Sequence, residues 1–307
     1  MTEKIPFRIA PMLPTLVAKP FDRQGWVYEE KYDGYRILAY KEGSRVTLLS
    51  RNGKGRTEAY PDVVTAVAML LPRTLLLDGE VVAFDKHRVS RFQILQEGRS
   101  APVYAVFDCL FQDGHDLRAK PLAVRRGLME PAIRGSKVLL ASHRLNASGL
   151  RAFQEAKARG YEGVVAKDLK SPYIEGRTRR WLKFKVHQED EFVIAGYTQP
   201  AGSREYFGAL LLGAYHGGHL QFVGKVGTGF DRELLASLFR RFQPLVRRQS
   251  AFINPPKEKG VTYLAPRLIA QISYQELTAD QKLRQPVFLG VRDDKDARQV
   301  FLPGDEK

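Results

Sequence analysis

The stretch EEKYDGYR, from Glu29 to Arg36, brings a lysine, an acid, a glycine and an arginine close together in the chain. It continues the run WVY, whose composition is typical of a β-strand. Glu29 and Lys31 are two positions apart, so a strand would carry both side chains on one face. Gly34 allows a tight turn after the lysine. The chain contains no Walker A sequence (GxxxxGK followed by Ser or Thr), which excludes P-loop nucleotide chemistry.

Short β-rich runs make up most of the chain before residue 187. Most follow one another without a helix between them, which favours an antiparallel α+β domain over a doubly wound sheet. These runs carry Val, Ile, Leu, Phe and Tyr between turn residues, and they are WVYEEK (26–31), YRILAYK (35–41), RVTLLSR (45–51), TLLLDGEVVAFD (74–85), VYAVFDCLF (103–111), KVLLASH (137–143), EGVVAKD (162–168) and RRWLKFKV (179–186).

Two helices are predicted among these runs. The segment 148–160 has the N-cap candidate Ser148 and the C-terminal Gly160. The segment 61–71 follows Pro61 and has apolar residues at helical spacing, namely Val63, Val64, Val67, Leu70 and Leu71.

The pattern changes near 187–191, where HQEDE forms a short polar link. Short strands joined by Gly-rich turns follow, together with one amphipathic helix at 231–243. About five strands and one helix in this length resemble a small OB-type Greek-key barrel. We therefore predict an antiparallel-sheet domain over residues 1–188 and an OB-fold β-barrel domain over 189–307.

Composition narrows the class of protein. The 307 residues include 49 Lys and Arg against 34 Asp and Glu, a formal net charge of +15, which calls for a polyanionic partner such as nucleic acid or a phosphorylated ligand. One cysteine excludes an intrachain disulfide framework. The sequence has no signal-peptide pattern and no apolar stretch of membrane-spanning length, so we expect a soluble intracellular protein.

A series of further motifs follows EEKYDGYR in the chain. Together they resemble, in order, the signatures of the covalent nucleotidyltransferases, which are ATP-dependent DNA ligases, RNA ligases and mRNA capping enzymes. The family's first signature, KxDGxR, is matched by Lys31, Asp33, Gly34 and Arg36. The later matches are SRNG (50–53), DGE (78–80), YAVFDCLF (104–111), EGVVAK (162–167), WLKFK (181–185) and RDDK (292–295).

The resemblance implies that Lys31 attacks the α-phosphate of ATP and becomes adenylated. An amine must be neutral to attack, and nearby cations or desolvation lower a lysine pKa. Lys183 and Lys185 share a strand face, so we expect them to lower the pKa of Lys31 and to bind the phosphate. Arg292 and Lys295 are implied to assist the same step from the second domain.

The resemblance also assigns the nucleotide and metal contacts. Glu29 would accept from the adenine amino group and Phe107 would stack on the purine, although an aromatic in an apolar run is often a core residue. Glu80 and Glu162 supply oxygen ligands suited to Mg²⁺ or Mn²⁺. Ribose and phosphate oxygens would be bound by planar arginines, namely Arg36, Arg51 and Arg177. Arg51 and Arg177 could equally contact a nucleic-acid backbone.

The C-terminal run APRLIAQISYQELTADQKLRQPVFLGVRDDKDA, with GKVGTGF (224–230), resembles the ligase module of bacterial end-joining DNA ligases. One departure is Leu277, where that group has tryptophan. The resemblance implies nicked duplex DNA as substrate, the end-binding protein Ku and a primase-like polymerase as partners, a monomer, and a cytoplasmic, nucleoid-associated location. Met1 favours a two-domain minimal ligase over an excised module.

Two other functions stay open on the sequence alone. One is an RNA ligase or a capping-type guanylyltransferase, and the other is a non-catalytic nucleic-acid-binding module. The positive charge bears on the substrate, because one nucleotide accounts for few of the 49 cations. Clusters at 176–181 and 240–248 are better explained by a duplex backbone, and the latter comprises Arg240, Arg241, Arg247 and Arg248.

Overall fold

A computed structural model describes residues 3–186, 188–202 and 204–302. The chain divides into two compact units, Met1–Val186 and His187–Lys307. The predicted link at 187–191 begins with His187, which lies outside the described residues. No helix in the described ranges has the length and apolar character needed to cross a membrane.

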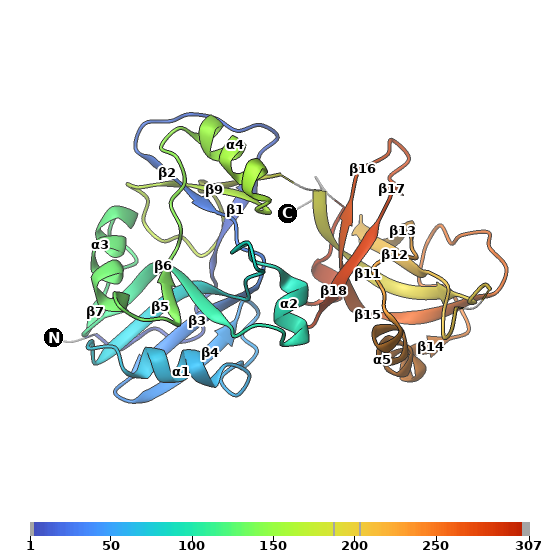
Figure 1. Cartoon of the computed structure of the whole chain (residues 1–307), viewed down its shortest axis with the longest axis horizontal. Coiled ribbons are helices and arrows are strands. Elements are labelled where there is room, and N and C mark those ends of the chain that lie inside the picture. Colours follow the sequence, from blue (N-terminus) through green and yellow to red (C-terminus); the bar gives the residue numbers. More distant parts are fainter. Residues whose placement is uncertain (1–2, 187, 203, 303–307) are drawn as a thin grey trace. The chain divides into compact units, whose positions relative to one another are not determined.

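The first unit contains a larger, mostly antiparallel sheet with strand order β4-β3-β5-β6-β7 (Figure 1). A short strand, β8 (Leu139–Ala141), pairs with β6 in parallel, so the run predicted at 137–143 is a shorter strand than expected. The other strands are β3 (Tyr35–Glu42), β4 (Arg45–Ser50), β5 (Thr74–Val82), β6 (Val103–Gln112) and β7 (His115–Asp116).

A smaller sheet of order β1-β10-β9-β2 faces the larger one. Its edge strand β1 (Met12–Leu16) pairs in parallel with β10 and was not predicted, because Pro14 and the short run MLPTL give little strand signal. The remaining strands are β2 (Trp26–Glu30), β9 (Gly163–Asp168) and β10 (Gly176–Lys185).

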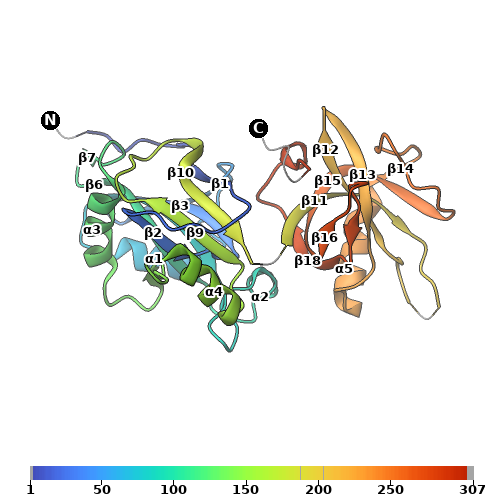
Figure 2. The ribbon, with the colours of Figure 1, turned by 90° about the horizontal axis from the view of Figure 1, so that it is seen from above.

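Helices cover the outer faces of both sheets. The helix α4 (Gly149–Arg159) packs on the smaller sheet through Ala152 and Ala156 (Figures 1 and 2). Its predicted caps are confirmed, since Ser148 Oγ accepts from the backbone N–H of Arg151 and Gly160 has φ +74°. The larger sheet is covered by α1 (Pro61–Ala68) and α3 (Leu122–Ile133), and a short helix α2 (Phe92–Glu97) follows β5.

Two sequence predictions about these helices were wrong. The helix α1 ends at Ala68, not at residue 71, and Leu71 is 99 % exposed instead of lying on the apolar face. The helix α3 was missed, because its sequence combines an internal Pro131 with buried arginines and has a weak apolar stripe. Tertiary partners of these arginines hold the helix in place, as described below.

Apolar residues from both sheets meet between them. Leu38 and Leu76 from the larger sheet pack in one cluster with Met12 and Trp181 from the smaller sheet. Phe107 belongs to this cluster, and its ring meets that of Trp181 edge to face at 5.9 Å. The inner faces of the two sheets are thus fixed against each other, and functional side chains on those faces are held in position.

The second unit is a curled antiparallel sheet of the predicted OB type. A meander of β11, β12 and β13 joins the long strand β15 through β11, which pairs along the whole of β15, and β18 pairs with residues 269–273 of β15. The strands are β11 (Gln188–Thr198), β12 (Leu210–His216), β13 (His219–Val226), β14 (Val246–Arg247), β15 (Val261–Tyr274), β16 (Glu276–Leu277), β17 (Leu283–Arg284) and β18 (Val287–Arg292).

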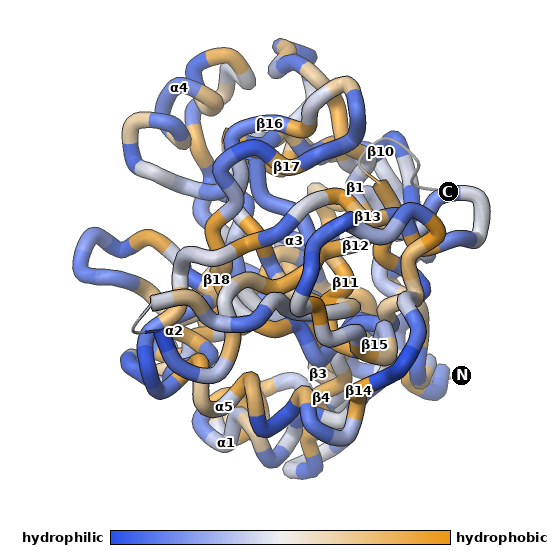
Figure 3. Tube along the Cα trace, turned by 90° about the vertical axis from the view of Figure 1, so that its right-hand side faces the viewer, coloured by the Kyte–Doolittle hydropathy of each residue, from blue (hydrophilic) through white to orange (hydrophobic). Residues whose placement is uncertain are grey.

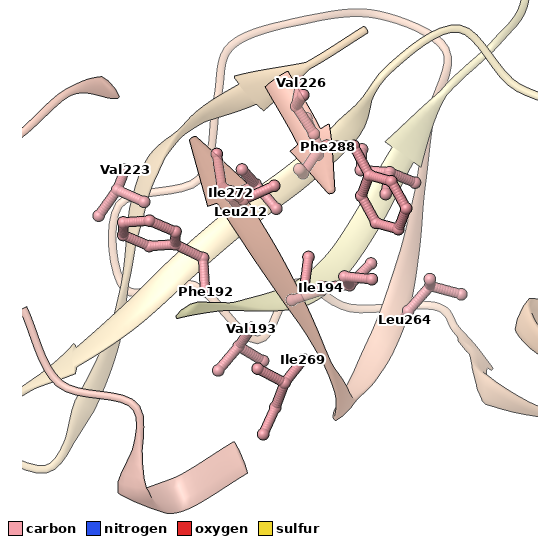
Figure 4. Packing of buried hydrophobic residues seen from close by; sticks show 14 of the residues in the cluster. Phe192, Val193, Ile194, Leu212, Val223, Val226, Leu264, Ile269, Ile272 and Phe288 are labelled. Atoms are coloured by element: carbon pink, nitrogen blue, oxygen red, sulfur yellow. The ribbon is translucent and has the colours of Figure 1, made fainter. Parts of the chain in front are cut away.

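The core of this unit is apolar and draws on most of its strands (Figure 4). The helix α5 (Arg232–Phe242) buries Leu235, Leu238 and Phe242, and Asp231 caps its N-terminus by accepting from the N–H of Leu234 at 2.8 Å. Hydrophobic and hydrophilic stretches therefore alternate along α5 (Figure 3). The helix predicted at 231–243 is confirmed.

Candidate active site

The inner face of the smaller sheet carries the predicted nucleophile Lys31 and two of the predicted cations, Lys183 and Lys185. In the register of this sheet, Val165 lies opposite Glu29 on one side and Lys183 on the other. Directly opposite residues of antiparallel strands point to the same face. Lys185 lies opposite Gly163, whose carbonyl accepts from the N–H of Lys31 at 3.0 Å. The structure therefore aligns Glu29, Lys31, Lys183 and Lys185 on one face, as the period of two predicts.

Lys31 forms an ion pair with Glu162, which precedes β9. Their side chains are only 20 % and 10 % exposed. Burial alone would lower the pKa of Lys31, but the Glu162 carboxylate, with smaller contributions from Asp33 and Glu80, raises it above its ordinary value. The expected lowering of this pKa by Lys183 and Lys185 is wrong for this structure, because the carboxylates around Lys31 act on it more strongly than any cation.

Glu29 is buried and accepts hydrogen bonds from three side chains. Its Oε1 accepts from Arg126 Nη1, and its Oε2 accepts from Ser142 Oγ at 2.8 Å and from Lys167 Nζ at 2.7 Å. The carboxylate is 1 % exposed, which by itself would raise its pKa, yet Lys167 and Arg126 bring the pKa below its usual value. Glu29 is therefore an ionised carboxylate in a buried site.

Phe107 lies next to this carboxylate. The ammonium of Lys167 is 4.2 Å from the centre of the Phe107 ring and 4.3 Å from that of Trp181, and the Arg36 guanidinium is 4.4 Å from the Phe107 ring. The ring is 7 % exposed and also belongs to the core cluster. An aromatic face and an acceptor carboxylate therefore adjoin at the Glu29 end, while Lys31 and Glu162 lie at the other.

Arg36 and Glu80 face each other across β3 and β5. Arg36 forms a forked pair with the buried Asp78, with Nε 2.5 Å from Oδ1 and Nη2 2.6 Å from Oδ2. Tyr173 donates to the same carboxylate at 2.7 Å. Arg36 thus lies on the inner face of the larger sheet, where its position is fixed by Asp78.

Arg51 and Arg177 lie at the margins of the first unit. Arg51 is in the turn that follows β4. Arg177 is exposed at the start of β10, where its Nη1 donates to the carbonyl of Pro14 at 3.1 Å.

The predicted final signature lies on the second unit. Arg292 is 8 % exposed at the end of β18 and makes a forked pair with the buried Asp294, with both N–O distances 2.9 Å. Its Nη1 also donates to Gln271 Oε1 at 3.2 Å. Lys295 forms an ion pair with Glu191 on β11. Neighbouring carboxylates thus position both cations of this signature.

Three residues around Glu29 were not identified as site residues from sequence. Arg126 comes from α3, the helix that sequence reasoning missed, and Ser142 follows β8. Lys167 ends the EGVVAK motif two positions after Val165, so its inner-face position could have been deduced from the strand period. No local pattern marks Arg126 or Ser142, because their partner is far away in the chain.

Family models match both units. Residues 11–185 match the ATP-dependent DNA ligase domain, and residues 203–295 match the C-terminal region of ATP-dependent DNA ligases. The first match alone covers more than half of the chain, and it includes Lys31 together with the other inner-face residues described above.

Similar proteins include the multifunctional non-homologous end joining protein LigD of Pseudomonas aeruginosa, 40 % identical over 96 % of this chain and 37 % of the relative. The LigD protein of Mycolicibacterium smegmatis is 37 % identical over 96 % of this chain and 40 % of the relative. The chain thus spans well under half the length of these relatives.

Solved structures agree with these similarities. A mycobacterial DNA ligase D complexed with ATP and MES matches with a TM-score of 0.74 at 33 % identity, covering 97 % of this chain and all of that one. The ligase domain of Mycobacterium tuberculosis LigD matches with a TM-score of 0.55 at 34 % identity, covering 96 % of this chain and 99 % of that one. The chain belongs to the family of ATP-dependent DNA ligases.

Proposed function

We propose that this chain seals nicks in duplex DNA, using ATP to adenylate Lys31. The neutral amine forms a bond to the α-phosphorus of ATP as the bond to pyrophosphate breaks, and the nitrogen then releases one proton to solvent. The AMP then passes to the 5′-phosphate at the nick, and the 3′-hydroxyl displaces it to join the strands. Inner-face cations balance the phosphate charge at each transfer.

The observation that carries this proposal is the Lys31–Glu162 pair on the same sheet face as Glu29, Lys183 and Lys185. One end of this arrangement holds an aromatic ring and an acceptor carboxylate, which suit a purine. The other end holds amines and carboxylates, which suit phosphates and their counterion. Such a graded site fits a nucleoside triphosphate with its α-phosphate near Lys31.

The carboxylates of Glu80 and Glu162 fit a divalent ion such as Mg²⁺ or Mn²⁺, because these ions prefer oxygen donors. The part of the chain that the structure describes has no group of three or more His, Cys, Asp or Glu side chains that could hold a metal. Phosphate oxygens and water would therefore complete the coordination. The bound ion would supply charge neutralisation on the phosphates.

We assign the remaining residues on the same basis. Glu29 and Phe107 bind the purine, and Lys183 and Lys185 bind the α-phosphate. Ribose and phosphate oxygens are bound by Arg36, Arg51 and Arg177, and Arg292 and Lys295 assist the adenylation of Lys31. Asp294 and Glu191 hold the last two cations ready on the second unit.

The role in the cell that we propose is the sealing of broken DNA in a bacterium. The similarity to proteins named for non-homologous end joining supports it. This role implies Ku and a primase-like repair polymerase as partners and a nucleoid-associated location in the cytoplasm. We expect the chain to act as a monomer on nicked duplex DNA.

The experiment that tests the activity is incubation with α-labelled ATP or GTP and Mg²⁺ or Mn²⁺, followed by a denaturing gel. Label from ATP on the polypeptide, abolished in Lys31→Ala, is the expected result. Label from GTP alone would indicate capping chemistry, and no label would indicate a binding module. Sealing of nicked DNA in preference to nicked RNA then identifies the substrate.

A further inference from the structure

The groups that surround Glu29 form a closed set of hydrogen-bond donors. Arginine and lysine side chains can only donate, so Arg126 and Lys167 each direct a proton at the Glu29 carboxylate. The Ser142 hydroxyl lies 3.0 Å from Arg126 Nη1 and 2.8 Å from Glu29 Oε2. Because Ser142 must accept from Arg126, its own proton points to Glu29.

The same geometry leaves a protonated Glu29 without a partner for its proton. Each residue that contacts the carboxylate is already donating to it, and the site is buried. A buried polar hydrogen without an acceptor costs free energy. The surrounding groups therefore hold Glu29 in the ionised form, in which it accepts hydrogen bonds and donates none.

One acceptor direction on Glu29 is not used by these three residues. A carboxylate has about four lone-pair directions. Oε2 receives Ser142 and Lys167, whereas Oε1 receives Arg126. Oε1 can therefore accept one more hydrogen bond. The Phe107 ring lies near the same carboxylate, because Lys167 donates to Oε2 and its ammonium is 4.2 Å from the ring centre.

The position of Arg126 is itself fixed. Its Nε and Nη2 both donate to Glu130 Oε1, at 3.1 and 2.9 Å, one turn further along α3. The Arg126 side chain is 1 % exposed. The helix thus presents one free edge of the guanidinium to Glu29 and Ser142, and the carboxylate cannot rotate without losing these contacts.

We propose that Arg126, Ser142 and Lys167 are positioning residues that make Glu29 an obligatory acceptor and thereby select a 6-amino purine over a 6-oxo purine. This inference rests on the proposed function, in which Glu29 reads the base. An amino group donates to the remaining lone pair of Glu29. A 6-oxo group would place two acceptors against each other in a buried site, which is strongly unfavourable.

The test compares three nucleotides in single-turnover formation of the covalent adduct, measured by intact mass and by pyrophosphate release. ATP carries a 6-amino group, ITP a 6-oxo group, and purine riboside triphosphate a hydrogen. The variant is Ser142→Ala, which removes one hydroxyl. Its matched control is Ser136→Ala, whose Oγ accepts from the N–H groups of Val138 and Leu139 and does not contact Glu29.

We expect Ser142→Ala to reduce kcat/KM for ATP about tenfold and to leave purine riboside triphosphate nearly unchanged, since the latter has no amino group to bind. We expect Glu29→Gln to lower the ratio of kcat/KM for ATP to kcat/KM for ITP more than the other variants do, because an amide can rotate to donate to a 6-oxo group. The control Ser136→Ala should show the same ratios of kcat/KM between the three nucleotides as the wild type.

If Ser142→Ala lowered kcat/KM equally for ATP and for purine riboside triphosphate, the proposal would be overturned, since a purely structural role lowers both values. An ATP to ITP ratio unchanged in Glu29→Gln would also overturn it. In both cases an active wild type would leave the proposed function intact. A wild type that forms no adduct with any of the three nucleotides would instead refute the proposed function, and this inference with it.

Discussion

Lys31 and Glu162 form an ion pair across 131 residues of chain, and both side chains are largely buried. The pair couples the two chemical requirements of the site. A lysine must lose its charge to attack phosphorus, and a carboxylate must be available to a metal ion that neutralises phosphate. In this structure each group neutralises the other, so both are kept in place without an unpaired buried charge.

Removal of the Glu162 carboxylate should slow the chemistry of the site. We expect Glu162→Gln to slow Lys31 adenylation about 10²- to 10³-fold, the usual cost of one electrostatic group in a phosphoryl-transfer site. Single-turnover labelling with saturating ATP measures the effect. The exposed Glu58→Gln is the matched control, and a loss below threefold in Glu162→Gln would contradict the assigned role.

Glu30 should make the stability of the protein depend on pH. Its side chain is 4 % exposed, and Oε1 has no hydrogen-bond partner among the described residues. His143 Nδ1 is 3.6 Å from Oε2, and the charge of Arg159 acts on the carboxylate in the direction opposite to burial. Burial raises the pKa of Glu30 to about 8. Between its unfolded pKa near 4.5 and this value, the folded state holds a proton that the unfolded state releases, so stability falls as pH rises.

The variant Glu30→Gln removes this ionisation. As pH rises from 5 to 8, the free energy of unfolding of the wild type should fall by about 1–3 kcal/mol relative to that of Glu30→Gln. Each unit of difference between the folded and unfolded pKa is worth about 1.4 kcal/mol. Denaturant unfolding at a series of pH values measures it. Curves for wild type and Glu30→Gln that run parallel would show that Glu30 ionises normally in the folded protein.

Asp294 should matter for adenylation and not for strand joining. It is 1 % exposed and holds the guanidinium of Arg292. Loss of a group that orients a functional residue commonly costs about 10- to 100-fold, and we expect Asp294→Asn to slow the labelling of Lys31 by this amount. Sealing of DNA that already carries a 5′-adenylate should proceed at the normal rate.

The exposed Asp280→Asn is the control for this prediction, because it changes the charge of the same unit without contacting Arg292. If Asp294→Asn slows both reactions equally, the substitution acts on the fold of the second unit and the orienting role is excluded.

Exposed arginines on the second unit should contribute to DNA affinity. Each phosphate contact adds about −0.9 to the slope of log affinity against log salt. We expect the double change Arg247→Gln and Arg248→Gln to reduce this slope by about 1–2 for nicked DNA. Labelling of Lys31 by ATP should not change in the double variant. If the slope of log DNA affinity against log salt stayed unchanged, these two arginines would not contact the DNA backbone.

The sequence predicted the inner face of the smaller sheet well, because the motif order and the strand period of two both place Glu29, Lys31, Lys183 and Lys185 together. The helices with clear end signals were also predicted, as Ser148 and Gly160 illustrate. These features depend on residues that are near one another in the chain.

Features that depend on distant partners were not predictable. The helix α3 buries Arg125 and Arg126, which resemble surface residues in a one-dimensional pattern. Arg125 is buried because it forms a forked pair with Asp108, and Arg126 is buried because it contacts Glu29. The ionised state of Glu29 likewise follows from groups that fold around it, and so does the raised pKa of Lys31.

We propose that Lys31 is the nucleophile and not only a phosphate-binding cation. Lys31→Arg separates the two roles, because arginine keeps a positive charge for Glu162 and for phosphate but is not deprotonated in proteins. The measurement is transfer of label from α-labelled ATP to the polypeptide, with nucleotide binding measured in parallel. We expect Lys31→Arg to bind ATP and to take up no label. Label that persists on Lys31→Arg would show that another residue carries the AMP, and Lys31 would then not be the nucleophile.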